Sequence, residues 1–544
     1  MKKRRAAALI GLFLMAFALR FYGIEKVGLS EDEAGKLLAI DSYMKGDFTP
    51  NAEHPMLMKT LSLLSVNMAR WLKPKDGEEW GLRLPNILFG ALTGVVIFLL
   101  AQELFGGLVG LWAFYLWAVG ITAITFNRVG KEDTLLVFFF LLANYLLIKG
   151  KNMTPGRSQD LLYYKGAASL GLMYASKYVV PYGWLTLFYY DILNRRKNSP
   201  WIIPASTWYK MIAVFVLFFL VANPMVLHPK VLGYIKQYFL HKDVFTHHGY
   251  PFMGEVYKNK AIYTLWGVPF YYYFLYLGVK VPVSILLLLG IGMVVLFKRY
   301  RHEGSIFLLL WFFVWLIFIS LPGGKFARYI LSLMPAVYLI AGVGVEWTYQ
   351  KLRGWRSSLS PSVNIRSIPI MLLFGGLVVL LLHPGLVSVV SLPYYSLYLN
   401  QLGGGKIGYY FPHDEFYDVG LREAFAYLGE RAPQRSVVIA DTPKAFQLFS
   451  KRYGRSDLVF QPFSVNKLTL DEDGIYFFLL QPGRRYLENY KTYYLISQRF
   501  SPIHVVRVRG LEAVSIYRIE GREALQQLAS LVTIQGKEEG GEKQ

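Results

Sequence analysis

The sequence predicts a polytopic α-helical membrane protein with a C-terminal soluble α/β domain. Of its 544 residues, 54% are hydrophobic and 16% are aromatic. Long apolar runs recur from Ala6 to Val390, and runs of this length are typical of membrane-spanning helices. From Pro393 onward, short strand-like segments separated by polar residues replace them. We therefore divide the chain into a membrane domain, residues 1–392, and a soluble domain, residues 393–544.

The chain has a net charge of +22, and the positions of its basic residues indicate the role of that charge. Many lie in short loops between apolar segments, such as KGKNMTPGR after Ile148 and KRYRH after Phe297. This is the pattern of loops retained in the cytoplasm, so nucleic-acid binding through a basic patch is not expected. The chain has no cysteine, which excludes disulfides, thiolate nucleophiles and cysteine metal sites.

The N-terminus, MKKRR before an apolar run, resembles a signal peptide. However, Arg20, Phe21 and Tyr22 stand where a small-residue cleavage site would follow. We expect an uncleaved first helix with its basic end in the cytoplasm.

Requiring loop charge and helix direction to agree gives about eleven spans. Two apolar segments are left out: Met56–Leu72, which Lys59 interrupts, is predicted to be an interfacial helix, and Ile262–Gly278 an interfacial or re-entrant piece. The expected spans are residues 6–23, 84–104, 108–126, 134–148, 161–176, 179–193, 209–227, 281–297, 305–321, 330–347 and 368–390. This assignment predicts a multi-pass plasma-membrane protein whose C-terminal domain lies on the extracytoplasmic face.

The same assignment leaves four polar loops outside the membrane. They are residues 25–83, 127–133, 229–262 and 322–329. Ionisable groups beside a bilayer are costly unless they have a task, so we expect the chemistry in these loops.

The C-terminal domain begins with the glycine-rich linker PYYSLYLNQLGGG. A helix is predicted at about Val419–Glu430, and strands at SVVIAD, GIYFFLLQ, HVVRVRG and VSIYRIEG. The last residues, GKEEGGEKQ, are predicted to be a disordered tail.

The adjacent acids Asp32 and Glu33 break the apolar pattern after the first helix. One of them could be a general base that deprotonates an acceptor hydroxyl. They could also be ordinary first-turn charges of a surface helix that Ser30 caps, and spacing alone favours this interpretation. Both interpretations stay open.

Other loop residues also allow two interpretations. His54-Pro55 with Lys59 could position a phosphate or simply start a helix. The 127–133 loop, which contains Arg128 and Asp133, could be a local salt-bridge cluster or a second wall of an active site.

Three more basic residues lie near apolar runs. Lys177 could bind substrate or snorkel to the interface, whereas Lys325 and Arg328 follow two glycines and suggest an anion site. His241, His247 and His248 lack carboxylates at metal-ligand spacing, so no metal site is expected. The Walker, GxSxG and HExxH signatures do not occur in the sequence.

Taken together, the loop motifs resemble those of the GT-C membrane glycosyltransferases, in particular the protein O-mannosyltransferases and the aminoarabinose transferases that modify lipid A. His54-Pro55-Met56-Leu57-Met58-Lys59 resembles the HPPLxK segment of these families, with methionine in place of the second proline. The SKY run at Ser176 and the FARYILSLMPA run at Phe326 resemble later family segments. The resemblance covers about the first 350 residues and does not reach the C-terminal domain.

The resemblance implies an inverting transferase that moves a sugar from a polyprenyl-phosphate donor to an acceptor hydroxyl outside the membrane. Mannose to protein Ser/Thr is the first expectation, and a lipid or glycan acceptor the second. Asp32 would be the catalytic base, supported by Asp133 and by a pair between Glu33 and Arg128. The donor phosphate or substrate would be bound by His54, Lys59, Lys177, His247, Lys325, Arg328 and Tyr329. No metal or other cofactor is expected.

Two other functions are compatible with a polytopic chain. A transporter or flippase of a lipid-linked sugar would need charges near helix centres and broken helices at the midplane. A non-catalytic scaffold would leave the convergent polar loops unexplained.

Overall fold

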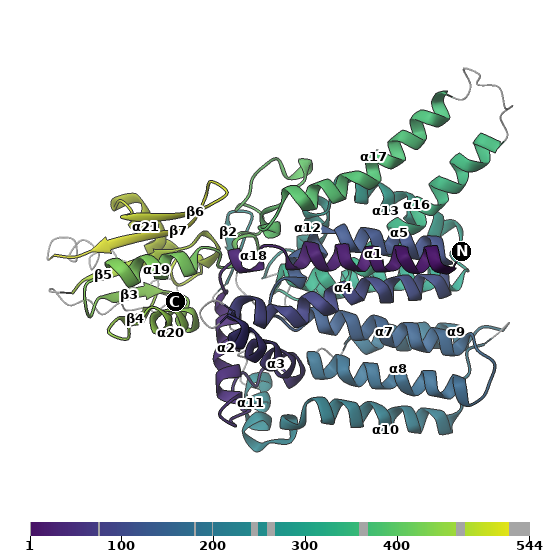
Figure 1. Cartoon of the computed structure of the whole chain (residues 1–544), viewed down its shortest axis with the longest axis horizontal. Coiled ribbons are helices and arrows are strands. Elements are labelled where there is room, and N and C mark those ends of the chain that lie inside the picture. The colour runs from purple at the N-terminus through teal and green to yellow at the C-terminus, as the bar shows by residue number, and fades with distance from the viewer. Residues whose placement is uncertain are drawn as a thin grey trace, which may run out of the picture.

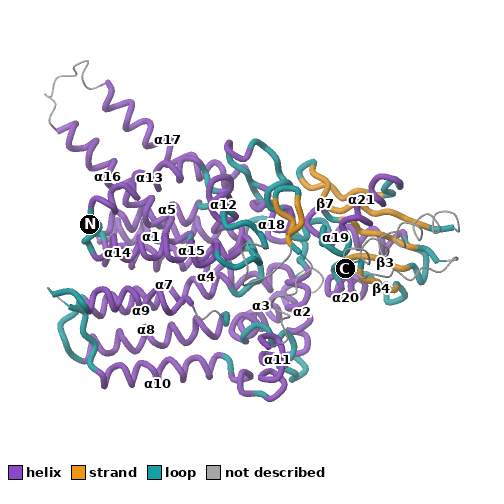
Figure 2. Tube along the Cα trace, turned by 180° about the vertical axis from the view of Figure 1, so that it is seen from behind, coloured by secondary structure: helices purple, strands orange, loops and turns teal. Residues whose placement is uncertain are grey.

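The computed structural model describes residues 2–73, 77–178, 181–197, 200–240, 249–257, 267–357, 368–463 and 474–521. A long helical body carries a smaller domain with a β-sheet at one end (Figure 1). Within the described residues, the strands are confined to this domain and to one short hairpin (Figure 2).

The helical body consists of segments that follow the apolar runs of the sequence. Their bounds are α1 Lys2–Phe21, α2 Glu31–Tyr43, α3 Met56–Leu72, α4 Glu78–Leu104, α5 Gly107–Val119, α6 Ile121–Asn127, α7 Asp133–Lys151, α8 Arg157–Ser176, α9 Pro181–Asn194, α10 Ala205–Ala222, α11 Pro229–Leu240, α12 Tyr272–Lys280, α13 Val283–Lys298, α14 Glu303–Leu309, α15 Trp315–Ser320, α16 Met334–Ser357 and α17 Ile368–Val390.

Within the described residues, six helices are long and apolar enough to cross a membrane, or eight if the bent pairs α5–α6 and α12–α13 each form one span. Helices α8, α9 and α16 lie alongside them (Figure 1). When α8, α9 and α16 are added to these eight candidates, each expected span of the sequence analysis corresponds to one of them. A mostly helical body with several apolar helices is therefore confirmed, while the number of spans stays a prediction. The 117° bend between α12 and α13 agrees with an interfacial or re-entrant α12.

The basic loops gather at the end of the body that holds the N-terminus. Arg5 donates to Gln102 at 2.8 Å, Lys151 pairs with Glu303 at 2.7 Å, and the Arg196 guanidinium donates to a main-chain carbonyl at residue 301. The polar loops lie at the opposite end, beside the C-terminal domain (Figure 1). The sequence-derived separation of basic loops from polar loops is therefore present in the fold.

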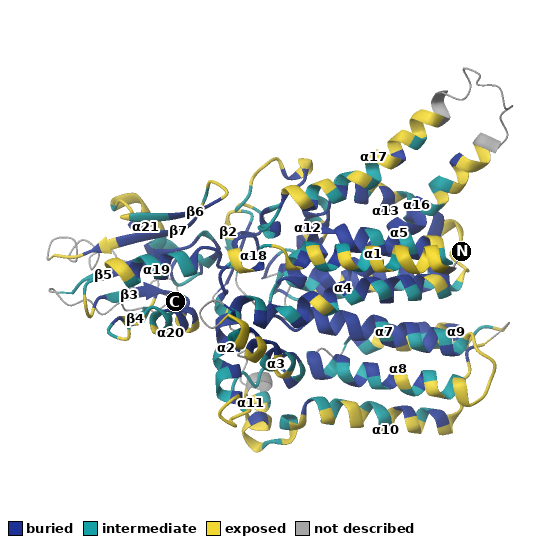
Figure 3. Ribbon diagram, in the orientation of Figure 1, coloured by how far each residue is buried: buried dark blue, intermediate teal, exposed yellow. Residues whose placement is uncertain are grey.

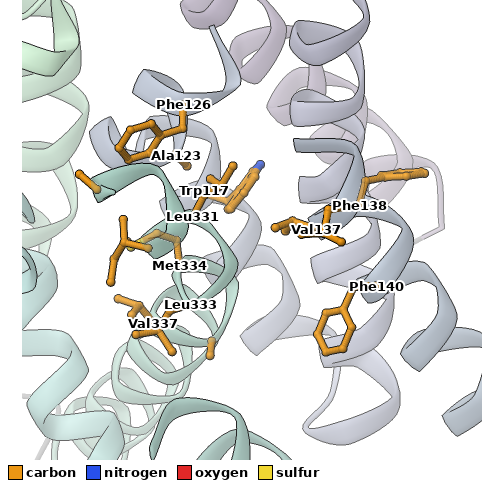
Figure 4. Packing of buried hydrophobic residues seen from close by; sticks show 14 of the residues in the cluster. Trp117, Ala123, Phe126, Val137, Phe138, Phe140, Leu331, Leu333, Met334 and Val337 are labelled. Atoms are coloured by element: carbon orange, nitrogen blue, oxygen red, sulfur yellow. The ribbon is translucent and has the colours of Figure 1, made fainter. Parts of the chain in front are cut away.

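The core of the body is closely packed. Trp117 of α5, Phe138 of α7 and Met334 of α16 belong to one cluster of buried apolar side chains (Figure 4). Small residues let helices approach: a Cβ added at Gly292 of α13 would lie 1.8 Å from the main-chain oxygen of Ile340 in α16. Such backbone contact is typical of helices that pack within a membrane.

Outward faces of several helices expose apolar side chains, as a lipid-facing surface would (Figure 3). Helix α3 also has two distinct faces, since it buries Met58 and Val66 but exposes Leu64, Met68 and Trp71. One face packed on protein and one apolar face left open agree with the interfacial helix predicted for this segment.

The C-terminal domain is an α/β sandwich of helices on one mixed sheet. Its elements are α18 Pro412–Phe416, α19 Leu421–Arg431, β3 Val437–Ala440, α20 Pro443–Arg452, β4 Val459–Pro462, β5 Tyr476–Leu480, α21 Tyr490–Arg499, β6 His504–Val508 and β7 Leu511–Ile519. The strand order is β4-β3-β5-β7-β6, with β3 parallel to β4 and β5, and β7 antiparallel to β5 and β6.

The four strands expected in this domain are therefore present as β3, β5, β6 and β7, and the expected helix as α19. Strand β4 and the hairpin of β1, Tyr250–Phe252, and β2, Glu255–Tyr257, were not expected from the sequence. Each is only three or four residues long, too short for a clear alternation of apolar and polar positions. The predicted disordered tail lies outside the described residues.

Candidate active site

The first turn of α2 carries three consecutive acids whose side chains have different partners. Ser30 caps the helix: its hydroxyl accepts from the backbone amide of Glu33, and the Glu33 carboxylate accepts from the backbone amide of Ser30. This reciprocal arrangement is a capping box. The capped helix proposed as the ordinary interpretation of this stretch is therefore correct as local structure, and it directs Glu31, Asp32 and Glu33 toward separate neighbours.

Glu33 is part of the buried framework. Its carboxylate forms two contacts with the guanidinium of Arg83 in α4, at 2.6 and 2.7 Å, and accepts from the amide of Gly130 at 2.8 Å. Burial favours the neutral acid, but Arg83 outweighs it and lowers the pKa of Glu33. Glu33 thus joins α2, α4 and the loop before α7.

The expected ion pair between Glu33 and Arg128 does not form, although the structure describes both residues. The Arg128 guanidinium instead donates to the carbonyl oxygens of Arg20, Tyr22 and Gly23, and it lies 5.1 Å from the ring of Tyr395. The physical reason is that the end of α1 presents unsatisfied carbonyls beside Arg128. Arg83, which the sequence did not single out, takes the position beside Glu33.

The Asp32 side chain does not join the Glu33 contacts but lies among basic residues. Its Oδ2 atom lies 2.5 Å from Lys131 Nζ, 3.9 Å from Arg328 Nη1 and 3.5 Å from the hydroxyl of Tyr417. The Asp32 side chain is 46% exposed, whereas those of Lys131 and Arg328 are 6% and 12% exposed. An accessible carboxylate is therefore surrounded by cations that are themselves held in place.

The electrostatic balance at Asp32 favours the ionised acid. Partial burial acts to raise its pKa, but Lys131, Arg328 and, more weakly, Lys36 lower it well below the usual value. Burial also lowers the pKa of Lys131 to about 8. Asp32 is a carboxylate at neutral pH and can accept a proton.

Arg328 joins Asp32 to the second predicted loop. Its Nε lies 3.8 Å from Asp133 Oδ2, and the other Asp133 oxygen accepts from Lys177 Nζ at 2.6 Å. Lys177 also lies over the ring of Tyr329, 4.4 Å from its centroid. Residues from five distant parts of the sequence thus meet in one cluster, which we call the Asp32 cluster: Asp32, Lys131, Asp133, Lys177, Arg328, Tyr329 and Tyr417.

A second group lies beside the Asp32 cluster. Lys36 forms a buried ion pair with Glu132, and His54 Nδ1 lies 3.9 Å from the same carboxylate. Burial lowers the pKa of His54 well below its usual value, so this imidazole is neutral at pH 7. Lys59 Nζ donates to the carbonyls of Asn51 at 2.6 Å and of His54 at 3.0 Å, which fixes the loop before α3.

Two other predicted residues lie apart or cannot be placed. Lys325 Nζ donates to the carbonyl oxygens of Val268 and Pro322 and, among the described residues, forms no ion pair with the Asp32 cluster. His247 lies outside the described residues. Roles for Lys59, Lys325 and His247 in phosphate binding stay predictions.

The sequence analysis did not identify Lys36, Arg83 and Tyr417, and it included Lys131 only as an unnamed member of the 127–133 loop. Lys36 carries a detectable signal, because it follows Asp32 by four residues and so lies on the same side of α2. Tyr417 carries none, since it lies 385 residues beyond Asp32. It has a positive φ of 42°, and the next residue, Asp418, has a φ of 60°.

Within the described residues, no group of three or more histidines and acids could hold a metal ion. The Asp32 cluster instead alternates cations with carboxylates. Lysine and arginine groups of this kind suit an anionic ligand such as a phosphate.

Comparisons with known proteins show what the sequence and the fold resemble. Residues 72–225 match the family model described as dolichyl-phosphate-mannose-protein mannosyltransferase. An uncharacterized protein of Aquifex aeolicus (strain VF5) is 29% identical over 269 residues, and the match spans 48% of each chain. The matched region is therefore about half the length of that relative.

Solved structures resemble nearly the whole chain. ArnT from Cupriavidus metallidurans bound to undecaprenyl phosphate aligns with a TM-score of 0.52 at 14% identity, covering 94% of this chain and 97% of that one. This chain has the GT-C glycosyltransferase fold. The archaeal oligosaccharyltransferase AglB from Archaeoglobus fulgidus, in complex with an inhibitory peptide and a dolichol-phosphate, shares the GT-C fold at a TM-score of 0.51 and 12% identity. That alignment covers 85% of this chain and 65% of AglB. The GT-C resemblance inferred from the loop motifs is thereby confirmed.

Proposed function

We propose that this chain is an inverting glycosyltransferase that moves a sugar from a polyprenyl phosphate to an acceptor hydroxyl. The observation that carries the proposal is the position of Asp32, an accessible carboxylate inside a cluster of three buried or nearly buried cations. The GT-C fold supports the reaction class. Undecaprenyl phosphate bound to ArnT and dolichol-phosphate bound to AglB support the donor class.

In the proposed reaction, Asp32 accepts the proton of the acceptor hydroxyl. The acceptor oxygen forms a bond to the anomeric carbon while the bond from that carbon to the phosphate oxygen breaks. The electron pair leaves with the lipid phosphate, and Lys131, Lys177 and Arg328 stabilise its negative charge. Attack from the face opposite the leaving group inverts the anomeric centre.

The low pKa of Asp32 sets a condition on this reaction, because a weakly basic carboxylate is a poor proton acceptor. A donor phosphate placed beside Lys131 and Arg328 would offset their positive charge at Asp32. The pKa of Asp32 would then rise, so that the base becomes effective once the donor is bound.

The proposal also covers the acceptor of the sugar and the side of the membrane on which transfer takes place. Basic loops at the N-terminal end of the body support a cytoplasmic N-terminus and an Asp32 cluster on the outer face. Mannose transfer to protein Ser/Thr is the first candidate, in keeping with the family model that matches residues 72–225. A lipid or glycan acceptor is the second.

The test is transfer from a panel of radiolabelled polyprenyl-phosphate sugars in membranes that contain the full chain. Wild type is compared with Asp32→Asn and with Asp47→Asn. Asp47 is an exposed acid of the loop after α2, and its carboxylate accepts from the amide and the hydroxyl of Thr49. The proposal predicts product from one donor, loss of product in Asp32→Asn and normal transfer in Asp47→Asn. Full activity in Asp32→Asn contradicts the assigned base, and movement of labelled lipid across vesicles without a glycosidic product favours a flippase.

A further inference from the structure

The C-terminal domain holds the helix turn that carries Asp32. The carboxylate of Glu31 accepts from two backbone amides at the start of α20, Lys444 at 3.0 Å and Ala445 at 2.8 Å. The first amides of a helix have no partner within it and carry a partial positive charge. Glu31 supplies both the missing acceptors and the opposite charge, so this contact joins two helix starts from separate domains.

A second link reaches the same residue from its main chain. The backbone amide of Glu31 donates to Asp418 Oδ2 at 3.0 Å, and Arg484 holds Asp418 through two contacts, one of them 2.8 Å. Asp418 directly follows Tyr417, whose hydroxyl lies beside Asp32. The strand-rich domain thus contacts both the residue before Asp32 and the carboxylate of Asp32 itself.

Close packing leaves little space for α2 to shift. A Cβ added at Gly35 would lie 2.7 Å from the Lys444 side chain, so α2 and the start of α20 are in direct contact. The Asp32 carboxylate extends from the same first turn, and its 2.5 Å contact with Lys131 depends on where that turn lies. A shift of 1 Å in a catalytic group can lower a rate by about a hundredfold.

We propose that Glu31 is a positioning residue through which the C-terminal domain sets the place of Asp32 beside Lys131 and Arg328. The inference rests on the proposed function for its catalytic part. It assigns to the C-terminal domain a role in the chemical step, in addition to anything that domain binds.

A different contact between the two domains provides a matched control. Arg452, near the end of α20, pairs with Glu78 at 2.5 Å and with Glu79 at 2.8 Å in the first turn of α4. This contact joins the same α20 to the membrane domain but does not involve the first turn of α2. A variant at Arg452 therefore weakens domain docking without removing the support of Asp32.

The experiment compares full-length wild type, Glu31→Ala, Glu31→Gln and Arg452→Met in lipid nanodiscs, with the donor that wild type uses. For Glu31→Ala we expect kcat to fall by about 10- to 100-fold while KM for the donor changes by less than about threefold. Glu31→Gln keeps one acceptor oxygen, so its kcat should lie between the values of wild type and Glu31→Ala. Arg452→Met should retain kcat within about threefold of wild type.

A pH profile separates positioning from a general loss of folded protein. If Asp32 moves away from Lys131 and Arg328, the acid limb of kcat/KM shifts to higher pH in Glu31→Ala and stays in place in Arg452→Met. Hydrogen exchange of peptides covering residues 30–36 gives a readout that needs no activity. It should be faster in Glu31→Ala and unchanged in Arg452→Met.

Equal loss of kcat in Glu31→Ala and Arg452→Met, with the acid limb unmoved in both, would overturn the inference. So would normal turnover in Glu31→Ala. If wild type transfers no sugar from any donor, the proposed function fails instead, and hydrogen exchange then decides whether Glu31 holds α2. Unchanged exchange in Glu31→Ala would reject that structural role as well.

Discussion

The ammonium of Lys131 lies 2.5 Å from the carboxylate of Asp32, and this contact joins the start of α2 to the loop before α7. The two residues are nearly a hundred positions apart, and each belongs to a loop that the sequence indicated as part of a site. Lys131 is buried while Asp32 is half exposed, so the cation is fixed and the carboxylate remains accessible.

Lys131→Met tests the electrostatic role of this contact. Because Lys131 lowers the pKa of Asp32, its removal should raise that pKa and move the acid limb of kcat/KM to higher pH. Activity should fall most below neutral pH, where more of Asp32 becomes protonated. The measurement is the pH–rate profile, with Lys45→Met, an exposed lysine of the loop after α2, as the control. An unchanged acid limb would show that Lys131 does not govern the ionisation of the base.

Tyr417→Phe tests whether the contact of the C-terminal domain with Asp32 contributes to activity. It removes a hydroxyl that lies 3.5 Å from Asp32 Oδ2 and leaves the ring in place. Loss of one weak hydrogen bond, of about 1 kcal/mol, predicts a fall in kcat of roughly three- to tenfold. Tyr409→Phe, in an exposed part of the same domain, should behave like wild type. Equal kcat values in both variants would exclude a contribution of the Tyr417 hydroxyl.

The buried pair of Glu33 and Arg83 should govern stability. Replacing Arg83 by methionine leaves a buried carboxylate without its partner, and such a loss destabilises by about 3–5 kcal/mol. The double variant Glu33→Gln with Arg83→Met should recover part of that loss, because neither charge remains. Thermal unfolding in detergent measures both, and a double variant less stable than Arg83→Met would contradict the account.

The pH dependence of this pair has a definite sign. The folded state lowers the pKa of Glu33 below its unfolded value, so the pair stabilises fully above the unfolded pKa. Its contribution is lost as the pH falls toward the folded pKa. Unfolding of wild type should therefore become easier in acid, whereas the Glu33→Gln and Arg83→Met double variant should lose this part of the dependence.

Local sequence patterns predicted the helices and the general location of the site. Apolar runs specify membrane helices because burial against lipid and neighbouring helices requires them, and their length and charge can be read directly. The motif resemblance identified Asp32, Asp133, Lys177 and Arg328, which the fold brings together. These four residues lie in the segments where local pattern and family motif coincide.

Tertiary pairing could not be predicted in the same way. The sequence analysis paired Glu33 with Arg128, whereas the structure pairs it with Arg83, because Arg128 donates to carbonyls at the end of α1. Tyr417 reaches Asp32 through the docking of a domain whose sequence carries no related motif. Contacts of this kind depend on the packing of whole elements, which a single sequence does not encode at any fixed spacing.

Helix packing in the membrane domain can be tested at three glycines. A Cβ at Gly292 would lie 1.8 Å from the oxygen of Ile340, and a Cβ at Gly344 would lie 2.2 Å from the oxygen of Leu288. These neighbours are backbone atoms, so α13 and α16 would have to move apart, and we expect Gly292→Ala or Gly344→Ala to destabilise by about 1–3 kcal/mol. Gly290→Ala is the control in the same helix, because its Cβ would meet nothing within 4 Å. Alanine has the higher helix propensity, so this variant should match or slightly exceed wild type in thermal unfolding. Equal stability of Gly292→Ala and Gly290→Ala would mean that α13 and α16 do not touch through their backbones.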